Sequence, residues 1–338
     1  MHFLITGHTG FKGSWLSLLL QAQGHTISGI SLEPNLKSLY TQASLHDVFQ
    51  DDLRVDIRDR EKISDAISQV NPEVIIHLAA QPLVRESYRN PIETFDINVL
   101  GTLNVLEATK KLRQLKAVLI VTTDKVYKNH NHPRGYVETD ELGGDDPYSA
   151  SKAAADISAQ SWIKCFATVP IAIARAGNVI GGGDWSQDRI IPDLVNAYAM
   201  GLLPSIRYPE SIRPWQHVLD CLNGYLTLVD RQIQDGWGGA WNFGPLYGEK
   251  YSVSFLVDSF AAEWGGVTTQ SWLKESTAQP QETQHLLLDS TKSSSKLRWS
   301  EKLNFAESIA WTAAWYKNAP SGDCRELTQA QVNSFLTK

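Results

Sequence analysis

The sequence predicts an α/β fold, with a Rossmann-type, doubly wound parallel sheet and a smaller, mixed α/β domain toward the C-terminus. Apolar strand-like runs alternate with amphipathic helix-like segments through the first half of the 338 residues, and parallel strands need such crossover helices. The chain also opens with "FLITGHTGFKGSWLSLLL", residues 3–20, in which an apolar strand, a glycine-rich turn and a helix follow one another. We therefore place a Rossmann domain at residues 1–178 and a substrate domain at 179–338, with some segments exchanged between them.

The expected elements follow this rhythm along the chain. Residues 3–5 are apolar enough for a buried parallel strand, and the helix from Ser14 keeps its apolar spacing until Gly24. Next we expect strands at 25–32 and 53–59, a helix at 60–70, a strand at 73–80, a helix at 95–112, a strand at 116–127, a helix at 149–166 and a strand at 170–181. After Gly181, Gly, Trp, Pro and Arg interrupt shorter helical pieces at 190–201, 218–230 and 253–264, so the second domain begins near there.

The composition limits the partners and the compartment. A net charge of −6 without a basic stripe argues against nucleic acid and anionic membranes, and no apolar run approaches the roughly 20 residues of a membrane span. The three cysteines form no Cys-x-x-Cys, and the histidines show no ligand spacing. We therefore expect a cytoplasmic protein that binds a small molecule and no metal.

The glycine-rich turn predicts a phosphate-binding loop. Gly7, Gly10 and Gly13 follow a Gly-x-x-Gly-x-x-Gly spacing. Small residues let the backbone approach a pyrophosphate, and the helix N-terminus offers unpaired N–H groups to it. Glycines also serve ordinary turns, so the motif alone leaves that alternative open.

Tyr148 and Lys152 form the most informative pair in the sequence. They stand four residues apart on an expected helix, so their side chains share one face. An ammonium beside a phenol stabilises the phenolate, and such a tyrosine can take a proton from a sugar hydroxyl while hydride leaves the same carbon for NAD. The alternative is an ordinary pair on the helix surface.

The stretch "VTTDKVY", residues 121–127, adds an acid and an amine at the end of a strand. A simple alcohol dehydrogenase needs only a hydroxyl there, which Thr122 and Thr123 provide. Asp124 and Lys125 suggest a second proton-transfer step. A 4-ketone acidifies the neighbouring C5–H, so Lys125 could take that proton while Asp124 protonates the departing C6 hydroxyl. The alternative is an Asp–Lys ion pair at the strand end.

Several stretches together resemble the extended short-chain dehydrogenases/reductases and, within them, the CDP-glucose 4,6-dehydratases, over essentially the whole chain. They are "GHTGFKGSWLSLLL", "HLAAQPLVRESY", "TTDKVY", "DPYSASKAAAD", "RAGNVIGGGDWSQDRIIPD", "IRPWQHVLD" and "WNFGP". The resemblance implies that Thr123 bonds the substrate hydroxyl, Asp124 is the acid, Lys125 is the base, Tyr148 is the activated phenol and Lys152 modulates it. Related dTDP-glucose dehydratases usually carry glutamate where Lys125 stands.

The resemblance also implies a cofactor site and a nucleotide-sugar site. The expected cofactor-binding residues are Gly7, Thr9, Gly10, Phe11, Lys12, Gly13, Asp56, Ile57, Leu78, Ala79, Ala80, Asn98, Tyr148 and Lys152, and the expected substrate-binding residues are Gln81, Asn178, Arg189, Arg213 and His217. Asp56 resembles the adenine contact, and the two arginines suit a diphosphate because a guanidinium grips phosphate oxygens with two donors. A solvated aspartate and solvated arginines are the plain alternatives.

The residues alone leave the choice between NAD and NADP open. An NAD-specific Rossmann domain usually ends its second strand with an acid that holds the ribose 2′-hydroxyl. Ser31 stands at that place here and Glu33 follows two residues later, while Lys12 and Lys37 lie near enough in sequence to favour a 2′-phosphate. The resemblance itself implies NAD.

The activity that the resemblance implies is that of a hydro-lyase. It would convert CDP-glucose to CDP-4-keto-6-deoxyglucose and water, with hydride moved from C4 to C6 by NAD, for deoxysugars of lipopolysaccharide. Two alternatives are a 4,6-dehydratase or 4-epimerase acting on another nucleotide sugar, and a catalytically silent NAD-binding regulator. Helices near 94–110 and 149–166 carry excess apolar surface, and the resemblance implies that they join two subunits as a four-helix bundle.

Overall fold

The centre of the molecule is a sheet of seven parallel strands in the order β10-β6-β5-β4-β1-β2-β3. The computed structural model describes residues 1–132, 134–245, 251–265, 270–275 and 286–338. The strands are β1 (His2–Thr6), β2 (Thr26–Ser31), β3 (Asp51–Arg54), β4 (Val74–His77), β5 (Ala117–Val121), β6 (Ile171–Ala176) and β10 (Gly239–Phe243). The predicted doubly wound parallel sheet is therefore confirmed.

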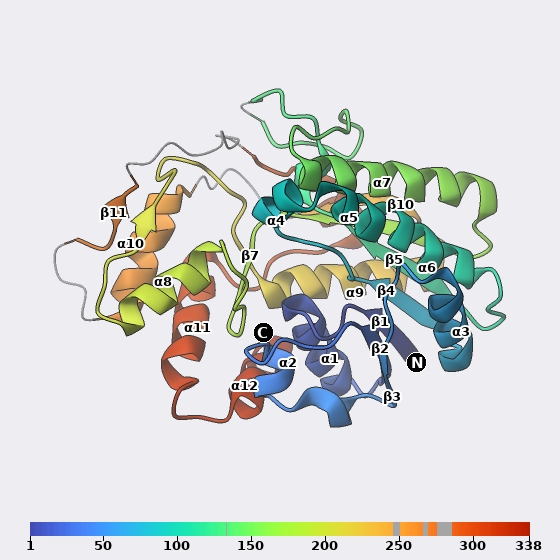
Figure 1. The fold of residues 1–338 in the computed structure, drawn as a ribbon, viewed down its shortest axis with the longest axis horizontal. Coiled ribbons are helices and arrows are strands. Elements are labelled where there is room, and N and C mark those ends of the chain that lie inside the picture. The colour runs from blue at the N-terminus through green and yellow to red at the C-terminus, as the bar shows by residue number, and fades with distance from the viewer. Residues whose placement is uncertain (133, 246–250, 266–269, 276–285) are drawn as a thin grey trace.

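Helices cover both faces of this sheet, as Figure 1 shows. One layer contains α3 (Arg60–Val70), α4 (Val84–Arg89), α5 (Pro91–Phe95), the π-helical segment η2 (Asp96–Gly101), α6 (Thr102–Thr109) and α7 (Pro147–Phe166). The other contains α1 (Phe11–Ala22) and α9 (Val218–Asp235), with α2 (Leu39–Gln42), η1 (Leu45–Val48) and α12 (Cys324–Thr337) around α1.

The strands bury both of their faces, which explains their unbroken apolar runs. On β5, Val118 and Ile120 pack with the α3, α6 and α7 layer, whereas Leu119 packs with the α1 and α9 layer. A strand between two helical layers has no polar face, so it shows no alternation in the sequence.

The C-terminal half contributes to the main sheet and also forms a separate lobe. After α9 the chain adds β10 beside β6 as a further parallel strand. The π-helical segment η4 (Ser293–Leu297) lies against β10 and α9. The lobe contains α8 (Ile190–Ala199), α10 (Val253–Trp264), α11 (Phe305–Asn318) and two short pairs of strands, β7 (Val179–Ile180) with β9 (Gln216–His217) and β8 (Ser205–Ile206) with β11 (Leu273–Lys274). In Figure 1, α8, α10 and α11 lie to the left of the sheet.

Several expected elements differ in detail from the structure. The strand expected at 53–59 is β3, which ends at Arg54, and the strand expected at 116–127 ends at Val121. The single helix expected at 95–112 is divided among α5, η2 and α6, and its middle is π-helical. The strand expected at 170–181 leaves the sheet after Ala176. At Gly177 the backbone passes so close to Pro214 that a Cβ would lie 2.3 Å from its Cγ, and the next residues pair with β9 instead.

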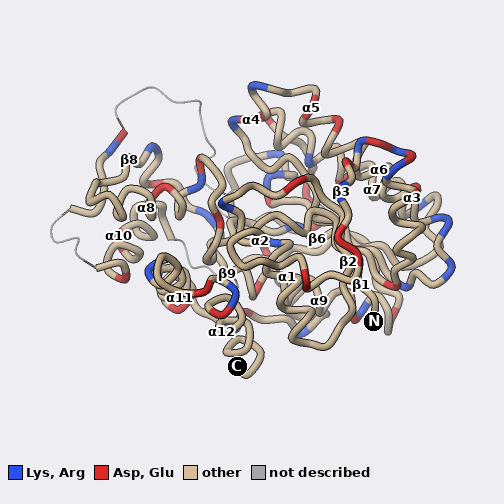
Figure 2. The backbone as a smooth tube through the Cα atoms, turned by 60° about the horizontal axis from the view of Figure 1, so that its bottom comes forward, with Lys and Arg blue, Asp and Glu red and all other residues tan. Residues whose placement is uncertain are grey.

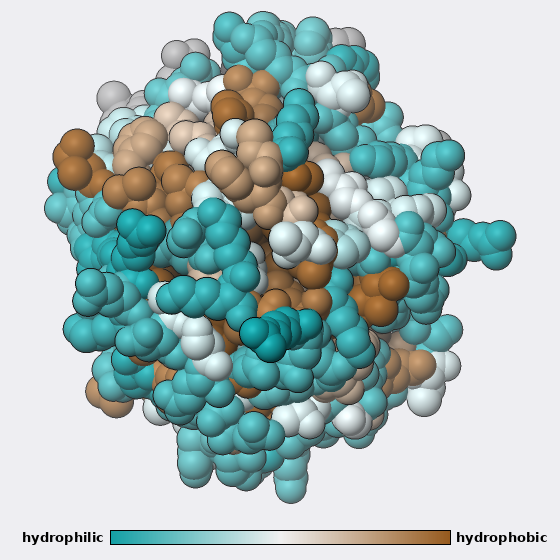
Figure 3. Space-filling model, turned by 90° about the vertical axis from the view of Figure 1, so that its right-hand side faces the viewer, coloured by the Kyte–Doolittle hydropathy of each residue, from teal (hydrophilic) through white to brown (hydrophobic). Residues whose placement is uncertain are grey.

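Exposed apolar side chains gather on the layer of α5, η2 and α7. Ile92 is 82% exposed, and Leu100, Ile157 and Phe166 are each about half exposed. Figure 3 views the molecule from its α3 and α6 side, and brown residues gather in the upper half of that view, the level at which Figure 1 draws α5 and α7. This surface is unusually apolar for one that faces water.

Charged residues show a different distribution. Figure 2 shows Lys and Arg interspersed with Asp and Glu along the whole tube. Within the described ranges, no helix is long and apolar enough to span a membrane.

Candidate active site

A cleft of about 1220 Å³ opens where the carboxyl ends of the sheet strands face the C-terminal lobe. Its walls come from the segments after β1 to β6 and from α8 and β8, the edge at which open α/β sheets bind ligands. The residues expected from the sequence that line it are Gly7, Thr9, Gly10, Phe11, Lys12, Gly13, Asp56, Ile57, Leu78, Ala79, Ala80, Thr123, Asp124, Lys125, Tyr148, Lys152, Asn178, Arg189 and Arg213.

The glycine loop after β1 leaves room for a phosphate group. Gly7 has a φ of +77°, and a Cβ there would lie 2.7 Å from the backbone nitrogen of Ala79. A Cβ on Gly13 would lie 2.3 Å from the Gly7 carbonyl oxygen. Gly10 begins α1 without a side-chain cap from any described residue, so the first-turn N–H groups are available to an anion. The loop fits the pyrophosphate of a dinucleotide.

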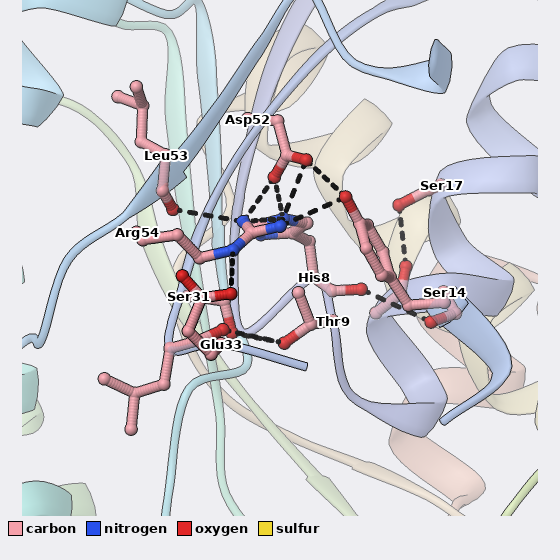
Figure 4. A network of polar contacts seen from close by, with 12 residues as sticks. His8, Thr9, Ser14, Ser17, Ser31, Glu33, Asp52, Leu53 and Arg54 are labelled. Carbon is pink, nitrogen blue, oxygen red and sulfur yellow. Dashed lines mark hydrogen bonds and ion pairs between the residues drawn. The ribbon is translucent and has the colours of Figure 1, made fainter. Parts of the chain in front are cut away.

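Beside this loop lies the position expected for the adenosine ribose, which Figure 4 shows in close-up. The hydroxyl oxygens of Thr9 and Ser31 are 2.6 Å apart. Arg54, which pairs with Ser31 across β2 and β3, brings its Nε to 3.5 Å from a Glu33 oxygen. Glu33, the acid two residues beyond the expected position, therefore forms an ion pair with Arg54 at the end of β3. Lys12, in contrast, points away toward α9, where its Nζ donates to the Tyr225 hydroxyl at 3.2 Å.

A second part of the same network ties the loop to β3. His8 Nε2 lies 2.7 Å from Asp52 Oδ1, and Asp52 also accepts hydrogen bonds from Arg54 and Tyr40. Burial acts to raise the pKa of the Asp52 carboxyl, but the hydrogen bonds from His8, Arg54 and Tyr40 outweigh burial and hold that pKa well below its usual value.

We expect Asp52→Asn to lower the free energy of unfolding by about 1–3 kcal/mol at pH 7, because three donors lose a carboxylate. A carboxyl whose pKa is lower in the folded state stabilises fully above its unfolded pKa of about 3.9 and loses this effect as the pH falls through the folded value. The difference between wild type and variant should therefore shrink below about pH 4. Urea unfolding at pH 7 and at lower pH measures the loss of stability and its pH dependence. The control is Asp235→Asn, in the surface Arg231–Asp235 pair, which should change the free energy of unfolding by less than about 0.5 kcal/mol.

Thr123, Asp124 and Lys125 lie together where β5 ends: Thr123 caps the short helix η3 (Asp124–Val126), which contains the other two. The Thr123 hydroxyl donates to Asp124 Oδ1 at 2.9 Å. Asp124 is buried, and its Oδ2 has no hydrogen-bond partner among the described residues. Burial raises the pKa of Asp124 above its usual value, against smaller opposing effects of Lys125 and Thr123. A carboxyl that holds its proton more firmly than usual suits a proton donor.

Tyr148 and Lys152 stand one turn apart in α7. Pro147 fills the first position of this helix, and Asp146 caps it by accepting from the Ser149 N–H at 2.9 Å. Thr123 lies near enough to Tyr148 to oppose the rise of its pKa, so the helix and the end of β5 present their functional groups to each other.

The contact of Lys152 differs from the direct ammonium–phenol pairing that the spacing predicts. Its Nζ donates to the Val121 carbonyl at 3.0 Å, at the end of β5. Burial lowers the pKa of Lys152 to about 8, with a further lowering by Lys12, and burial raises the pKa of Tyr148 to about 12. Spacing places both side chains on one helix face, but it does not show which neighbour the ammonium meets.

Three expected contact residues do not line the cleft. Asn98 is buried in η2, where its amide bonds the backbone of Gln81 at 2.9 and 3.1 Å and the Ser151 hydroxyl at 2.9 Å. The Gln81 side chain donates a hydrogen bond to the Thr94 hydroxyl on α5 and accepts one from the Leu83 N–H. His217 is fully buried at the start of α9, and burial lowers its pKa to about 3. These side chains bond protein groups behind the cleft wall.

Arginines from four segments line the cleft. Arg189 precedes α8 and lies 3.8 Å from an Asp184 oxygen, and Arg213 is buried before β9. Sequence reasoning missed Arg85 on α4 and Arg207 directly after β8. The sequence signal for Arg207 is an arginine next to a short strand, and this pattern is too common to identify one residue.

The arrangement defines a class of protein. A dinucleotide loop, a Tyr–Lys pair on one helix and a cleft closed by a C-terminal lobe are the features of the extended short-chain dehydrogenases/reductases. No described group of three or more His, Cys, Asp or Glu side chains could hold a metal ion. The chain belongs to the GDP-mannose 4,6-dehydratase family, whose model matches residues 4–312.

Individual relatives narrow the comparison. The chain is 41% identical to a CDP-glucose 4,6-dehydratase of Salmonella typhimurium, over 98% of this chain and 95% of that protein. It is 28% identical to a probable dTDP-glucose 4,6-dehydratase of Sinorhizobium fredii, over 94% and 93% of the two chains. A solved structure of dTDP-glucose 4,6-dehydratase from Bacillus anthracis in complex with NAD is 23% identical, covers 97% of this chain and 99% of its own, and has a TM-score of 0.80. This last likeness shows the shared fold.

Proposed function

We propose that this chain is an NAD-dependent CDP-glucose 4,6-dehydratase, which forms CDP-4-keto-6-deoxyglucose and water. The observation that carries the proposal is the position of Asp124 and Lys125. An acid and an amine share one short helix on the wall of a dinucleotide cleft, beside Tyr148 and Lys152. A 4-epimerase needs no such acid and base. The 41% identity to the Salmonella enzyme over nearly the full length supports CDP-glucose as the substrate.

Each of the five side chains has one task in this reaction. Bound NAD supplies the acceptor for hydride from C4 and the donor of hydride to C6. Thr123 holds the C4 hydroxyl, Tyr148 takes its proton, and the Lys152 ammonium stabilises the phenolate. Asp124 then protonates the departing C6 hydroxyl while Lys125 takes the proton from C5, and the Lys125 ammonium returns a proton to C5 when hydride reaches C6. The glycine loop, Asp56 and the segment 78–80 would hold the cofactor, since all of them line the cleft.

The test is incubation of the purified protein with CDP-, dTDP-, UDP- and GDP-glucose. We expect a 4-keto-6-deoxy product, detected by its absorbance in alkali, from CDP-glucose at the highest kcat/KM. Product from another nucleotide sugar at higher kcat/KM would change the substrate, and a 4-epimer in place of a keto product would overturn the dehydratase itself.

NAD should bind more tightly than NADP, but by only about 1–2 kcal/mol. The position expected for the ribose 2′-group carries Ser31 and Arg54. Glu33 would repel a 2′-phosphate there, but its carboxylate is engaged in the ion pair with Arg54. Calorimetric titration of the protein with both cofactors measures the difference, and Glu33→Gln should narrow it. A preference for NAD beyond about a thousandfold would mean that another group reads the 2′-position.

The apolar surface of α5, η2 and α7 supports a homodimer in which these helices form a four-helix bundle. Ile92, Leu100 and Ile157 present their side chains there without cover from the described part of this chain. We expect a dimer at micromolar concentration by light scattering. Ile157→Asp should give a monomer, because an unpaired carboxylate would be buried at the interface.

The control for the dimer is Leu36→Asp. Leu36 is 86% exposed in the segment between β2 and α2, and α2 packs with α1 in the layer opposite α7, so this variant should remain dimeric. A wild-type monomer at micromolar concentration would contradict the proposed interface.

We also infer that the enzyme works in the cytoplasm. Cys165, Cys221 and Cys324 are free thiols, and free thiols persist in a reducing compartment. Its product is the kind of keto sugar from which deoxysugars of surface polysaccharides, lipopolysaccharide among them, are made.

A further inference from the structure

A buried arginine behind the active site joins the two segments that carry the catalytic groups. Arg175 on β6 is fully buried, and its Nε and Nη2 each donate to one oxygen of Asp156 at 2.8 Å. Asp156 lies on α7, one turn beyond Lys152. Thr122, at the end of β5, donates to the same carboxylate at 3.1 Å. A buried ion pair is costly unless its donors and acceptors are hydrogen-bonded. Here the Asp156 carboxylate accepts hydrogen bonds from Arg175 on β6 and from Thr122 at the end of β5.

The remaining arm of the guanidinium reaches the residue that follows η3. Arg175 Nη1 donates to the Tyr127 hydroxyl at 2.9 Å, and that hydroxyl donates to Asn242 Oδ1 at 2.6 Å. The Tyr127 ring is stacked on Tyr136, with centroids 5.2 Å apart. Burial raises the pKa of Tyr127 to about 12, although Arg175 opposes the shift. The hydroxyl therefore stays protonated and keeps its donor role toward Asn242.

The hydrogen bonds within η3 itself are long. The helix has only three residues, and its capping contact, from the Lys125 N–H to the Thr123 hydroxyl, measures 3.4 Å. Backbone hydrogen bonds join η3 to the following loop, and Val126 and Tyr127 pack with Ala153 of α7, but the hydrogen-bonded connection from Tyr127 to α7 runs through Arg175. Lys152, in contrast, has its own bond to the end of β5 at Val121.

We propose that Tyr127 is a positioning residue for dehydration, which sets Asp124 and Lys125 relative to α7 through Arg175. The inference rests on the proposed function, in which oxidation at C4 and elimination across C5 and C6 act on one bound sugar. The acid and the base must then reach neighbouring atoms of a substrate that Tyr148 already holds, and small displacements of a positioned group cost much of its rate effect. Oxidation depends on α7 and its own contact to β5, so it should be far less sensitive to the contact between Tyr127 and Arg175.

The test is Tyr127→Phe in the holoenzyme, with single turnovers of CDP-glucose followed by the absorbance of reduced nicotinamide. We expect the rate of cofactor reduction to stay within about twofold of wild type and its reoxidation to slow by at least about tenfold, so that reduced cofactor accumulates. Exchange of the C5 hydrogen with solvent deuterium should slow by the same factor, and KM should change by less than about twofold.

The matched control is Tyr198→Phe. Tyr198 is another buried tyrosine, and its hydroxyl donates to the Ser271 carbonyl at 2.7 Å, but it lies in the C-terminal lobe outside the cleft wall. Both rates should be unchanged in this variant. Equal slowing of reduction and reoxidation in Tyr127→Phe, or no change in either, would overturn the proposal and leave Tyr127 a structural residue.

A second measurement does not depend on the reaction. Amide hydrogen exchange should quicken at residues 124–128 in Tyr127→Phe and remain as in wild type along α7 and in Tyr198→Phe. Unchanged exchange at 124–128 would overturn the positioning role even if the enzyme used a different substrate. Absence of a keto product from wild type with every nucleotide sugar would instead overturn the proposed function alone.

Discussion

Replacing Lys125 by Met is expected to separate oxidation from dehydration. Lys125 lies half-buried in η3 on the cleft wall beside Asp124, and Met keeps most of its length without the amine. The variant should still reduce bound NAD when CDP-glucose is added, because hydride leaves C4 without this amine. Exchange at C5 and formation of the keto product should fall by about 10²–10⁴-fold, the usual contribution of a general base. Cofactor absorbance, mass spectrometry of the recovered sugar and the product assay measure the three quantities.

Lys128→Met provides the control for this variant. Lys128 lies three residues further on, outside the cleft wall, and pairs with Glu141 at 3.1 Å on the surface. Its replacement should change neither step. Near wild-type turnover and C5 exchange in Lys125→Met would make Lys125 structural, and Tyr148 would be the first candidate for the acceptor of the C5 proton.

The fold class was predictable because its signals are local. A strand, a glycine turn and a helix at residues 3–20, followed by alternating elements, specify a parallel sheet with helices on both faces. The addition of β10 beside β6 had no such signal, because the partner of a parallel strand depends on how the preceding helix, α9, crosses the sheet. The π-helical turn in η2 was equally invisible, since its side-chain spacing resembles that of an ordinary helix.

The candidate site also contains some residues that the sequence could place and others that it could not. Glycines with close backbone neighbours, such as Gly7 and Gly13, and the run after β5 could be placed from spacing, and the structure brings them to one cleft. The resemblance implies that Asn98 and His217 belong to the cofactor and substrate sites, and in the structure they bond backbone groups behind the cleft wall. Arg175 begins the stretch "RAGNVIGGGDWSQDRIIPD", but its role could not be predicted, because that role depends on contacts among three segments distant in sequence.

Removing the Tyr148 hydroxyl is expected to stop the reaction before dehydration begins. Tyr148→Phe should slow the reduction of bound NAD by about 10²–10⁴-fold, because the C4 hydroxyl loses its base. The ring remains in place, so the affinity for CDP-glucose should stay within about threefold of wild type. Stopped-flow absorbance and calorimetry measure these two quantities, and Tyr198→Phe again serves as the control.

The pH dependence of this step follows from the two groups on α7. The pKa of Tyr148 is raised to about 12, so the reactive phenolate becomes more abundant as the pH rises. The pKa of Lys152 is lowered to about 8, so the ammonium that stabilises the phenolate is lost above that pH. The wild-type rate of reduction should therefore rise with pH and level off near pH 8, and Tyr148→Phe should lack this rise.

The two variants together fix the order of the steps. The C5 proton becomes acidic only after a ketone has formed at C4, so Tyr148→Phe should abolish C5 exchange along with cofactor reduction. Lys125→Met should abolish the exchange and leave the reduction of the cofactor unchanged. If Tyr148→Phe exchanged the C5 hydrogen at the wild-type rate without reducing NAD, proton loss would precede oxidation. Lys125 would then act on a sugar that has no ketone, and the assignment of Tyr148 and Lys125 to successive steps would fail.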